Sequence, residues 1–343
     1  MNFLVVGLGS MGKRRIRCLK ALEEKNIFGF DLREDRAKEA NEKYGVETYT
    51  DFDKAIAEAK PEALIISVPP ANHGTYIKYA LEHSLHCFIE ASVVDHGMTD
   101  LLKLEQKSKT VVAPSSTLYF HPAVQMIKEI IRSGELGKLS NIIYHIGQYL
   151  PDWHTYEAVS EYYVSYPPTG GGREIVPFEL TWLLDILGMP KRVAGNFRKT
   201  INMEGAEGID DTYNFLLDYD NFLANITVDV VSRYMTRRLL INGDKKQLRW
   251  DWDVSAIEIF DPETNKWEKR EYQMLGSEAG YNANIGENMY IDEIKAFLNT
   301  VKTGVPFVNT LKKDYEVLQV LYDIEKSDKE SRFMQTDKYW SGK

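Results

Sequence analysis

The chain of 343 residues lacks the residue patterns that mark disulfide-rich proteins and metalloproteins. It has two cysteines, Cys18 and Cys87, which form neither a redox motif nor a metal-ligand spacing, so both are expected to be small buried side chains. The seven histidines are scattered and show no ligand spacing. The sequence therefore predicts no disulfide framework and no metal.

Long basic blocks and long apolar runs are also absent. The formal net charge is −9, so the chain lacks the positive surface that nucleic acid requires, and nucleic acid is not expected as a partner. No apolar run approaches the roughly 18 residues that span a bilayer, and the first residues resemble a strand rather than a leader segment. We therefore expect no membrane association and a cytoplasmic location.

What the chain does contain begins at its start, with the pattern of a dinucleotide-binding unit. Phe3–Val6 is a short apolar run typical of a buried parallel strand. A G-x-G-x-x-G turn follows, in which the first glycine permits the tight turn, the second lets the backbone approach a pyrophosphate, and the third lets the helix pack closely. The residues of this turn that are predicted to bind the cofactor are Gly7, Gly9, Ser10, Met11 and Gly12.

A second apolar run, Ile27–Phe30, ends in Asp31, which lies 19 positions beyond the last glycine of the turn. A carboxylate at this place can accept both ribose hydroxyls of an adenosine, and it repels a 2′-phosphate. The sequence thus favours NAD over NADP, although Arg33 follows closely. The cations of the first helix are interpreted as a solvated face: Lys13, Arg14 and Arg15.

Strands and helices alternate up to about residue 120, which predicts a doubly wound parallel sheet, a Rossmann domain, over residues 1–120. The strand Ala63–Val68 ends at two prolines. Ligands bind at the carboxyl ends of such strands, so Val68, Pro69 and His73 are expected beside the cofactor.

Residues 121–343 are predicted to form a second, α+β domain for substrate binding and oligomerisation. Strand-like segments from Thr212 to Tyr272 follow one another through turns, with Asn242-Gly243 as a strong hairpin signal, and predict a large, mostly antiparallel sheet. The second face of such a sheet is commonly buried, so a homodimer or homotetramer is expected. The closing helices, Ile285–Val301 and Leu311–Glu325, are expected to pack back on the first domain.

Four ordered motifs resemble the Gfo/Idh/MocA oxidoreductases: GLGSMG, SVPPANHGTYIKYALEHSLHCFIE, YFHPAVQMIKEIIRSGELGKL and a GGG-led helix that ends in DILG. The resemblance implies NAD or NADP in the N-terminal domain. It also implies that the C-terminal domain places a sugar, cyclitol or nucleotide sugar over the nicotinamide. By the same resemblance, Glu90 matches the glutamate of the family's E-K-P triplet and lies near the cofactor.

The chain departs from this family where the family holds its proton-transfer residues. Ala91 stands at the position of the catalytic lysine. In the helix after the three glycines, the family usually has an aspartate and, four residues later, a histidine. If Glu174 stands at the position of this aspartate, Phe178 stands at the position of the histidine. Oxidation of an alcohol needs a group that takes the hydroxyl proton near neutral pH, and neither alanine nor phenylalanine can do so.

Glu174 and His121 are therefore the candidates for proton transfer, and the predicted substrate residues are Arg173, Tyr149, Trp153 and His154. Each candidate has a structural alternative. Glu174 can cap the helix that begins near Val176, and Arg173 can form an internal salt bridge. His121 can be a packed cap before Pro122, and the aromatic side chains can belong to the core.

The sequence predicts an NAD(P)-dependent oxidoreductase that acts on a hydroxyl or keto group of a sugar, nucleotide sugar or cyclitol. Two alternatives stay open because the lysine is missing. One is a dinucleotide-binding sensor or assembly subunit without redox turnover. The other is an enzyme that uses NAD transiently in an elimination or hydrolysis.

Overall fold

The computed structural model describes residues 1–95, 97–153, 157–274 and 286–336. The chain forms two compact units. Unit 1 comprises Met1–Thr117 and Glu287–Tyr315, and unit 2 comprises Leu118–Gly286 and Glu316–Lys343. Among the described residues, no helix combines the length and the apolar character that crossing a membrane requires.

Unit 1 is built on a six-stranded sheet in the order β3-β2-β1-β4-β5-β6, and all five pairings are parallel. This confirms the predicted Rossmann sheet. Its central strands are buried on both faces, as their continuous apolar runs predict. The strands are β1 (Phe3–Val6), β2 (Ile27–Phe30), β3 (Glu47–Tyr49), β4 (Ala63–Ile66), β5 (His86–Ile89) and β6 (Val112–Pro114).

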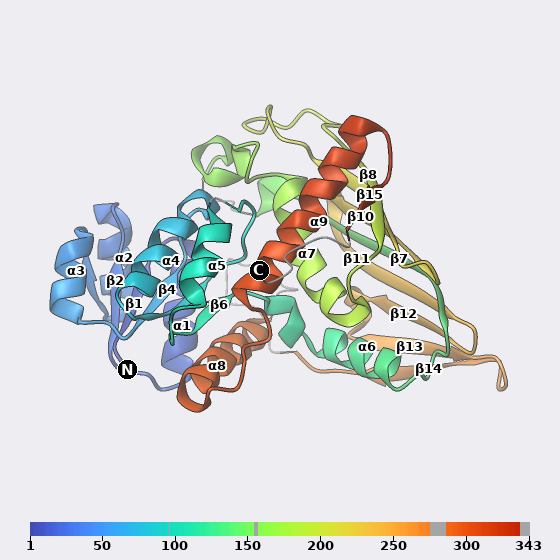
Figure 1. Ribbon diagram of the computed structural model, residues 1–343, viewed down its shortest axis with the longest axis horizontal. Coiled ribbons are helices and arrows are strands. Elements are labelled where there is room, and N and C mark those ends of the chain that lie inside the picture. Colours follow the sequence, from blue (N-terminus) through green and yellow to red (C-terminus); the bar gives the residue numbers. More distant parts are fainter. Residues whose placement is uncertain (96, 154–156, 275–285, 337–343) are drawn as a thin grey trace. The chain divides into compact units, whose positions relative to one another are not determined.

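Helices connect these strands, and one further helix of unit 1 comes from the distant end of the sequence (Figure 1). The connecting helices are α1 (Ser10–Ala21), α2 (Glu34–Tyr44), α3 (Phe52–Ala59), α4 (His73–Glu82) and α5 (Met98–Glu105). The distant helix, α8 (Glu287–Thr303), packs against α1. Cys18 on α1 and Cys87 on β5 are free and fully buried, as predicted.

The expected solvated face of α1 is wrong for two of its three cations. Arg14 is 3% exposed and Arg15 is completely buried. Arg14 lies 3.5 Å from Glu287, and its guanidinium lies over the Tyr290 ring. The correction has a simple physical cause, because α8 covers a helix face that local spacing alone assigns to solvent.

Unit 2 contains a nine-stranded sheet in the order β14-β13-β12-β11-β7-β10-β9-β8-β15. The pairing of β10 with β7 is parallel and the other pairings are antiparallel, so the predicted mostly antiparallel sheet is confirmed. The strands are β7 (Leu139–Tyr149), β8 (Arg192–Arg198), β9 (Thr212–Asp218), β10 (Leu223–Asp229), β11 (Val231–Gly243), β12 (Gln247–Asp251), β13 (Ala256–Asp261), β14 (Lys266–Glu271) and β15 (Met334–Gln335).

Two helices of unit 2, α6 (Pro122–Arg132) and α7 (Gly172–Leu187), lie on one face of this sheet (Figure 1). A third helix, α9 (Leu311–Glu330), begins in unit 1 and belongs to unit 2 from Glu316 onward. Between α7 and the sheet, the Glu179 carboxylate accepts hydrogen bonds from Tyr144 and Trp182 and pairs with Arg237. Glu179 is therefore part of the core.

The start of α7 differs from the expected helix Val176–Leu187. The helix begins four residues earlier, at Gly172, and Pro177 lies inside it. Pro177 has no backbone N–H, so the helix lacks one backbone hydrogen bond at this residue. The loss lies near the N-terminal end of the helix and not at its centre. Arg173 and Glu174 are consequently held on the first turn of a helix instead of in a loop.

Candidate functional site

The three glycines of the first turn serve different purposes. Gly7 has a φ of +91°, and a Cβ atom built on it would lie 2.5 Å from the Ser67 carbonyl oxygen. A Cβ atom on Gly12 would lie 1.8 Å from the carbonyl oxygen of Gly7. These two glycines are thus required by the fold itself.

Gly9 is not required by internal packing. The nearest atom to a Cβ built on it is Nη1 of Arg36, at an ordinary van der Waals separation of 3.5 Å. The open space above this backbone is what the approach of a pyrophosphate needs. The local geometry of Gly9 therefore fits an adenine dinucleotide.

The N-terminus of α1 begins at this open glycine. Gly9 is the N-cap, no side chain caps the helix, and its first turn holds no acidic residue. The first N–H groups of a helix have no intrahelical acceptor, so those of Ser10, Met11 and Gly12 suit the phosphate oxygens of a bound nucleotide.

Asp31 follows the end of β2, and its carboxylate is fixed by two backbone groups. Oδ2 accepts the N–H of Leu8 at 2.7 Å and Oδ1 accepts the N–H of Arg33 at 2.9 Å. Each oxygen can accept a further hydrogen bond. The carboxylate is thereby oriented beside the glycine turn, which suits ribose hydroxyls as donors.

His73 starts α4, just after the turn formed by Val68 and Pro69. Its Nε2 lies 3.0 Å from the Val68 carbonyl oxygen, and burial lowers the pKa of His73 to about 4. Since a carbonyl only accepts, Nε2 carries the proton. Nδ1 is then a buried acceptor without a partner among the described residues, and it can receive a donor from a ligand.

Glu90 is engaged inside unit 1. Arg15 donates to its two carboxylate oxygens at 2.7 and 2.8 Å, and Ser67 donates to Oε1 at 3.1 Å. Arg15 also lies 2.9 Å from Glu293 on α8. Glu90 thus connects β5 to the helix behind the glycine turn, and its direct contact with a cofactor stays a prediction.

In unit 2, Glu174 has the properties of a proton-transfer group. The Tyr163 hydroxyl donates to Oε1 at 2.5 Å, while Oε2 is buried without a partner among the residues that the structure describes. Burial raises the pKa of Glu174 to about 7, and the hydrogen bond from Tyr163 opposes this rise. The carboxyl group can therefore exist in both protonation states near neutral pH.

His121, the other proton-transfer candidate, is fully buried at the start of α6. Its Nδ1 accepts the N–H of Ala123 at 3.1 Å, and its ring lies 5.3 Å from the Trp250 ring. Burial, with a smaller contribution from the positive charge of Arg237, lowers the pKa of His121 to about 3. A histidine in this environment is a weak base, which favours the packed-cap interpretation.

Arg173 is bound within unit 2. Its Nε donates to Glu325 at 2.6 Å and its Nη1 donates to the Pro168 carbonyl oxygen at 2.5 Å. These contacts anchor the first turn of α7 to α9 and favour the internal salt bridge. A substrate contact by Arg173 stays a prediction.

The aromatic candidates are spread over β7 and the turn after it. The burial pattern of β7 alternates and places Tyr149 on the same sheet face as Ile143, away from α7. The Arg233 guanidinium lies 3.7 Å from the centre of the Tyr149 ring. Trp153 has a buried indole N–H without a partner among the described residues, and His154 lies outside them.

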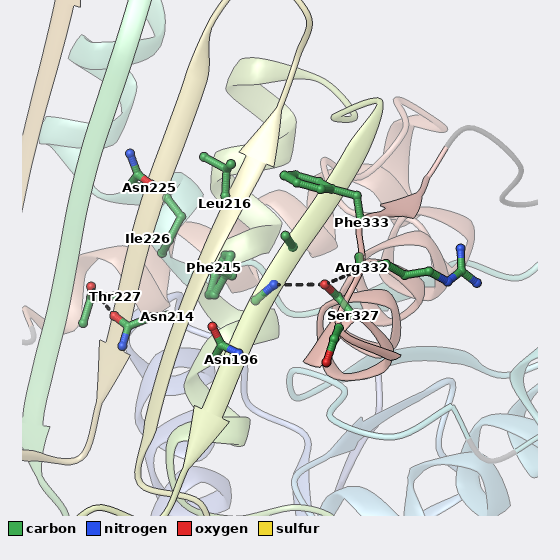
Figure 2. Close-up of a pocket in the computed structure, with 13 residues that line it drawn as sticks. Asn196, Asn214, Phe215, Leu216, Asn225, Ile226, Thr227, Ser327, Arg332 and Phe333 are labelled. Atoms are coloured by element: carbon green, nitrogen blue, oxygen red, sulfur yellow. Dashed lines mark hydrogen bonds between the residues drawn. The ribbon is translucent and has the colours of Figure 1, made fainter. Parts of the chain in front are cut away.

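A cavity of about 530 Å³ lies elsewhere in unit 2, and none of its lining residues was predicted to be functional. Figure 2 shows Asn196, Asn214 and Asn225 on three neighbouring strands and Arg332 and Phe333 beyond α9. Thr227 donates to the Asn214 amide oxygen at 2.8 Å, so this oxygen already has an internal donor. The Thr227 and Ser327 hydroxyl groups that line it donate to internal acceptors, and none of the predicted catalytic residues lines this cavity.

Two residues of interest were not identified from sequence as parts of the site. Tyr163 is one of them, and its hydroxyl donates the hydrogen bond that Glu174 accepts. Arg36 was not singled out, although its place soon after Asp31 was a usable signal. Among the described residues, no cluster of three or more metal-ligating side chains is found.

Comparisons with known protein families agree with these features. Residues 1–114 match a model described as an oxidoreductase family with an NAD-binding Rossmann fold. Residues 124–249 match the model of the GFO/IDH/MocA C-terminal domain. The two models belong to one family and together cover well over half of the chain.

Individual relatives are distant in sequence but similar along their whole length. A myo-inositol 2-dehydrogenase of Thermotoga maritima is 21% identical, and the match covers 97% of each chain. A levoglucosan dehydrogenase solved with NADH and levoglucosan is 13% identical with a TM-score of 0.83, over 98% of this chain and 100% of that one. An oxidoreductase from Agrobacterium radiobacter, solved with NAD+, L-tartaric acid and magnesium, is 13% identical with a TM-score of 0.84, over 98% of each chain.

Proposed function

Because the chain belongs to the Gfo/Idh/MocA family of oxidoreductases, we propose that it is an NAD-dependent dehydrogenase of a sugar, nucleotide sugar or cyclitol. The observation that carries the proposal is the open backbone at Gly9 beside the fixed carboxylate of Asp31. A pyrophosphate fits the first and ribose hydroxyls fit the second. The carboxylate would repel a 2′-phosphate, which supports NAD over NADP.

In this proposal the chain's own residues bind and orient the cofactor. The amides of Ser10, Met11 and Gly12 hold the phosphates, and Asp31 holds the adenosine ribose. Val68, Pro69 and the free Nδ1 of His73 bind near the nicotinamide end. When NAD is bound, its nicotinamide ring supplies the hydride acceptor for alcohol oxidation.

Glu174 is proposed to take the hydroxyl proton of the substrate. Its support is a buried carboxyl oxygen without a partner among the described residues and a pKa of about 7, while the family's lysine position holds Ala91. Tyr163 orients the carboxylate through its hydrogen bond. The low pKa of His121 makes it the weaker candidate. Trp153 remains a proposed substrate residue because its buried indole N–H has no acceptor within the described ranges of the chain.

A second candidate is a dinucleotide-binding protein without net redox turnover, or an enzyme that oxidises and re-reduces its substrate. Ala91 in place of the lysine is the observation that favours it. Net appearance of NADH with a sugar or cyclitol supports the dehydrogenase. Bound dinucleotide without net NADH formation supports the second candidate.

We further propose that the chain forms a homodimer or homotetramer through the sheet face of unit 2 that lies away from α7. This face exposes Ile143 on β7 and Leu223 on β10, which are 51% and 42% exposed. Apolar side chains of this size on a broad sheet face suit burial against a second copy. Sedimentation of the purified chain measures the oligomeric state.

The function is tested by releasing and identifying any co-purified dinucleotide and then scanning sugars, cyclitols and nucleotide sugars for NADH absorbance. Glu174→Gln is the informative variant because it retains size and the bond from Tyr163 while removing the basic oxygen. Loss of turnover with unchanged NADH binding supports the assignment. Full turnover in this variant contradicts it.

A further inference from the structure

Arg36 lies on the first turn of α2, which follows β2 and Asp31. Its side chain is half-buried. Nη1 of the guanidinium lies 3.5 Å from the place where a Cβ atom of Gly9 would stand. Arg36 therefore borders the same open space that the second glycine of the turn leaves for a ligand.

The Arg36 guanidinium makes no hydrogen bond, ion pair or ring contact with any residue in the part of the chain that the structure describes. The neighbouring cations differ from it in this respect. Arg33 pairs with Asp35 at 2.6 Å, and Lys13 pairs with Glu39 at 2.7 Å. Arg36 is thus a permanently charged donor group whose capacity is unused inside unit 1.

The surroundings of Arg36 favour an anion in this space. The uncapped N-terminus of α1 begins at Gly9 and carries partial positive charge. The nearby carboxylate of Asp31 already accepts two backbone N–H groups. The Arg36 guanidinium and the N-terminus of α1 border one open space and repel each other, and an anion between them would attract both. A guanidinium binds phosphate oxygens through strong, charge-assisted hydrogen bonds.

We propose that Arg36 binds a pyrophosphate oxygen of the adenine dinucleotide, opposite the amides of α1. This inference rests on the proposed dinucleotide site. Its position at Gly9 distinguishes this role from recognition of a 2′-phosphate, which would lie at the ribose beside Asp31. Arg36 is therefore a binding residue for NAD and NADP alike, and it does not select between them.

The test compares Arg36→Gln and Arg36→Lys with the control Arg33→Gln, whose wild-type side chain is already paired. Calorimetric titration with NADH, NADPH and ADP-ribose gives the dissociation constants, and thermal unfolding without ligand verifies that each variant folds. We expect Arg36→Gln to weaken all three ligands by a similar factor of tenfold or more. Arg36→Lys should lose less affinity, and Arg33→Gln should bind NADH as the wild type does.

Two results would overturn the inference. Unchanged NADH affinity in Arg36→Gln would show that the guanidinium does not reach the pyrophosphate. A loss confined to NADPH would show that Arg36 reads the 2′-phosphate instead. The wild type separates this inference from the proposed function, because failure of the unsubstituted chain to bind any of the three ligands would refute the dinucleotide site itself.

Discussion

Replacing Glu174 with glutamine should change both activity and the pH dependence of stability, because this buried carboxyl group has a raised pKa and is the proposed proton acceptor. The folded protein holds a proton on Glu174 up to pH of about 7, whereas the ordinary pKa of a glutamate is 4.5. The folded state therefore binds more protons than the unfolded state between these two values. Stability contributed by this proton is complete below pH 4.5 and is lost as the pH rises through 7.

The magnitude follows from the size of the pKa change. One pKa unit corresponds to about 1.4 kcal/mol, so a rise from 4.5 to 7 corresponds to about 3 kcal/mol. Glutamine cannot ionise, so Glu174→Gln removes this dependence. The variant should gain about 3 kcal/mol relative to the wild type between pH 5 and pH 8. Any constant cost of burying the amide cancels in that comparison.

The assay is denaturant unfolding of both proteins at several pH values, with Glu161→Gln as the control because Glu161 is exposed. The control should differ from the wild type by the same small amount at every pH. In parallel, wild-type alcohol oxidation should rise with pH to a plateau above about 7, since the Glu174 carboxylate is the proposed base. Glu174→Gln should lower kcat by about 100-fold or more.

The reasoning is refuted if the stability difference between Glu174→Gln and the wild type stays flat from pH 5 to pH 8. It is equally refuted if the variant retains kcat within threefold of the wild type at saturating substrate and NAD. The first result would mean that water reaches the carboxyl group. The second would mean that another side chain takes the proton.

Three further predictions follow from packing. Gly9→Ala should change the free energy of unfolding by less than about 1 kcal/mol in denaturant titration, yet weaken NADH binding tenfold or more in calorimetry. Gly12→Ala should destabilise or unfold the chain in the same denaturant titration. Arg15→Met should cost about 3–5 kcal/mol in denaturant unfolding because it leaves the buried Glu293 and the partly buried Glu90 without their cation, and a cost below 1 kcal/mol would contradict this. Ile143→Asp should shift the sedimenting species toward monomer while Val305→Asp, exposed on unit 1, should not.

The parts of the fold that are visible in the sequence are those specified by short-range patterns. The apolar run Phe3–Val6 and the glycines after it predict a strand, a turn and a helix, and β1 and α1 occur there. The hairpin signal Asn242-Gly243 falls where β11 turns into β12. In these stretches neighbouring residues determine the backbone, so no distant contact is needed to predict it.

The features that were missed depend on contacts between distant residues. Arg15 resembles a surface cation until Glu293, far along the sequence, is placed against it. β8 (Arg192–Arg198) has two arginines and a glycine and forms its strand by pairing with β9. The residues just before Val176 were expected to belong to the irregular passage that contains the three glycines, yet the helix already begins at Gly172.

The same distinction explains why the candidate site was only partly visible. The glycine spacing indicates which residues lie at the turn. Only the packing of the folded chain shows that Gly7 and Gly12 must lack a side chain for the fold, whereas Gly9 need not. Likewise, glutamates at 174 and 179 look alike in sequence. Glu179 uses its oxygens on Tyr144, Trp182 and Arg237, whereas Oε2 of Glu174 has no partner among the described residues.

His73, Arg36 and Glu174 share one physical property, which is a polar group without a partner in the described part of the chain. Folded chains satisfy nearly all buried polar groups internally because each unsatisfied group costs about 1–3 kcal/mol. This cost applies to the buried Nδ1 of His73 in unit 1 and the buried Oε2 of Glu174 in unit 2, whereas the Arg36 guanidinium is only half-buried. The cofactor and the substrate that we propose would supply the missing partners, so the cost that the free protein bears at the buried groups would become binding energy.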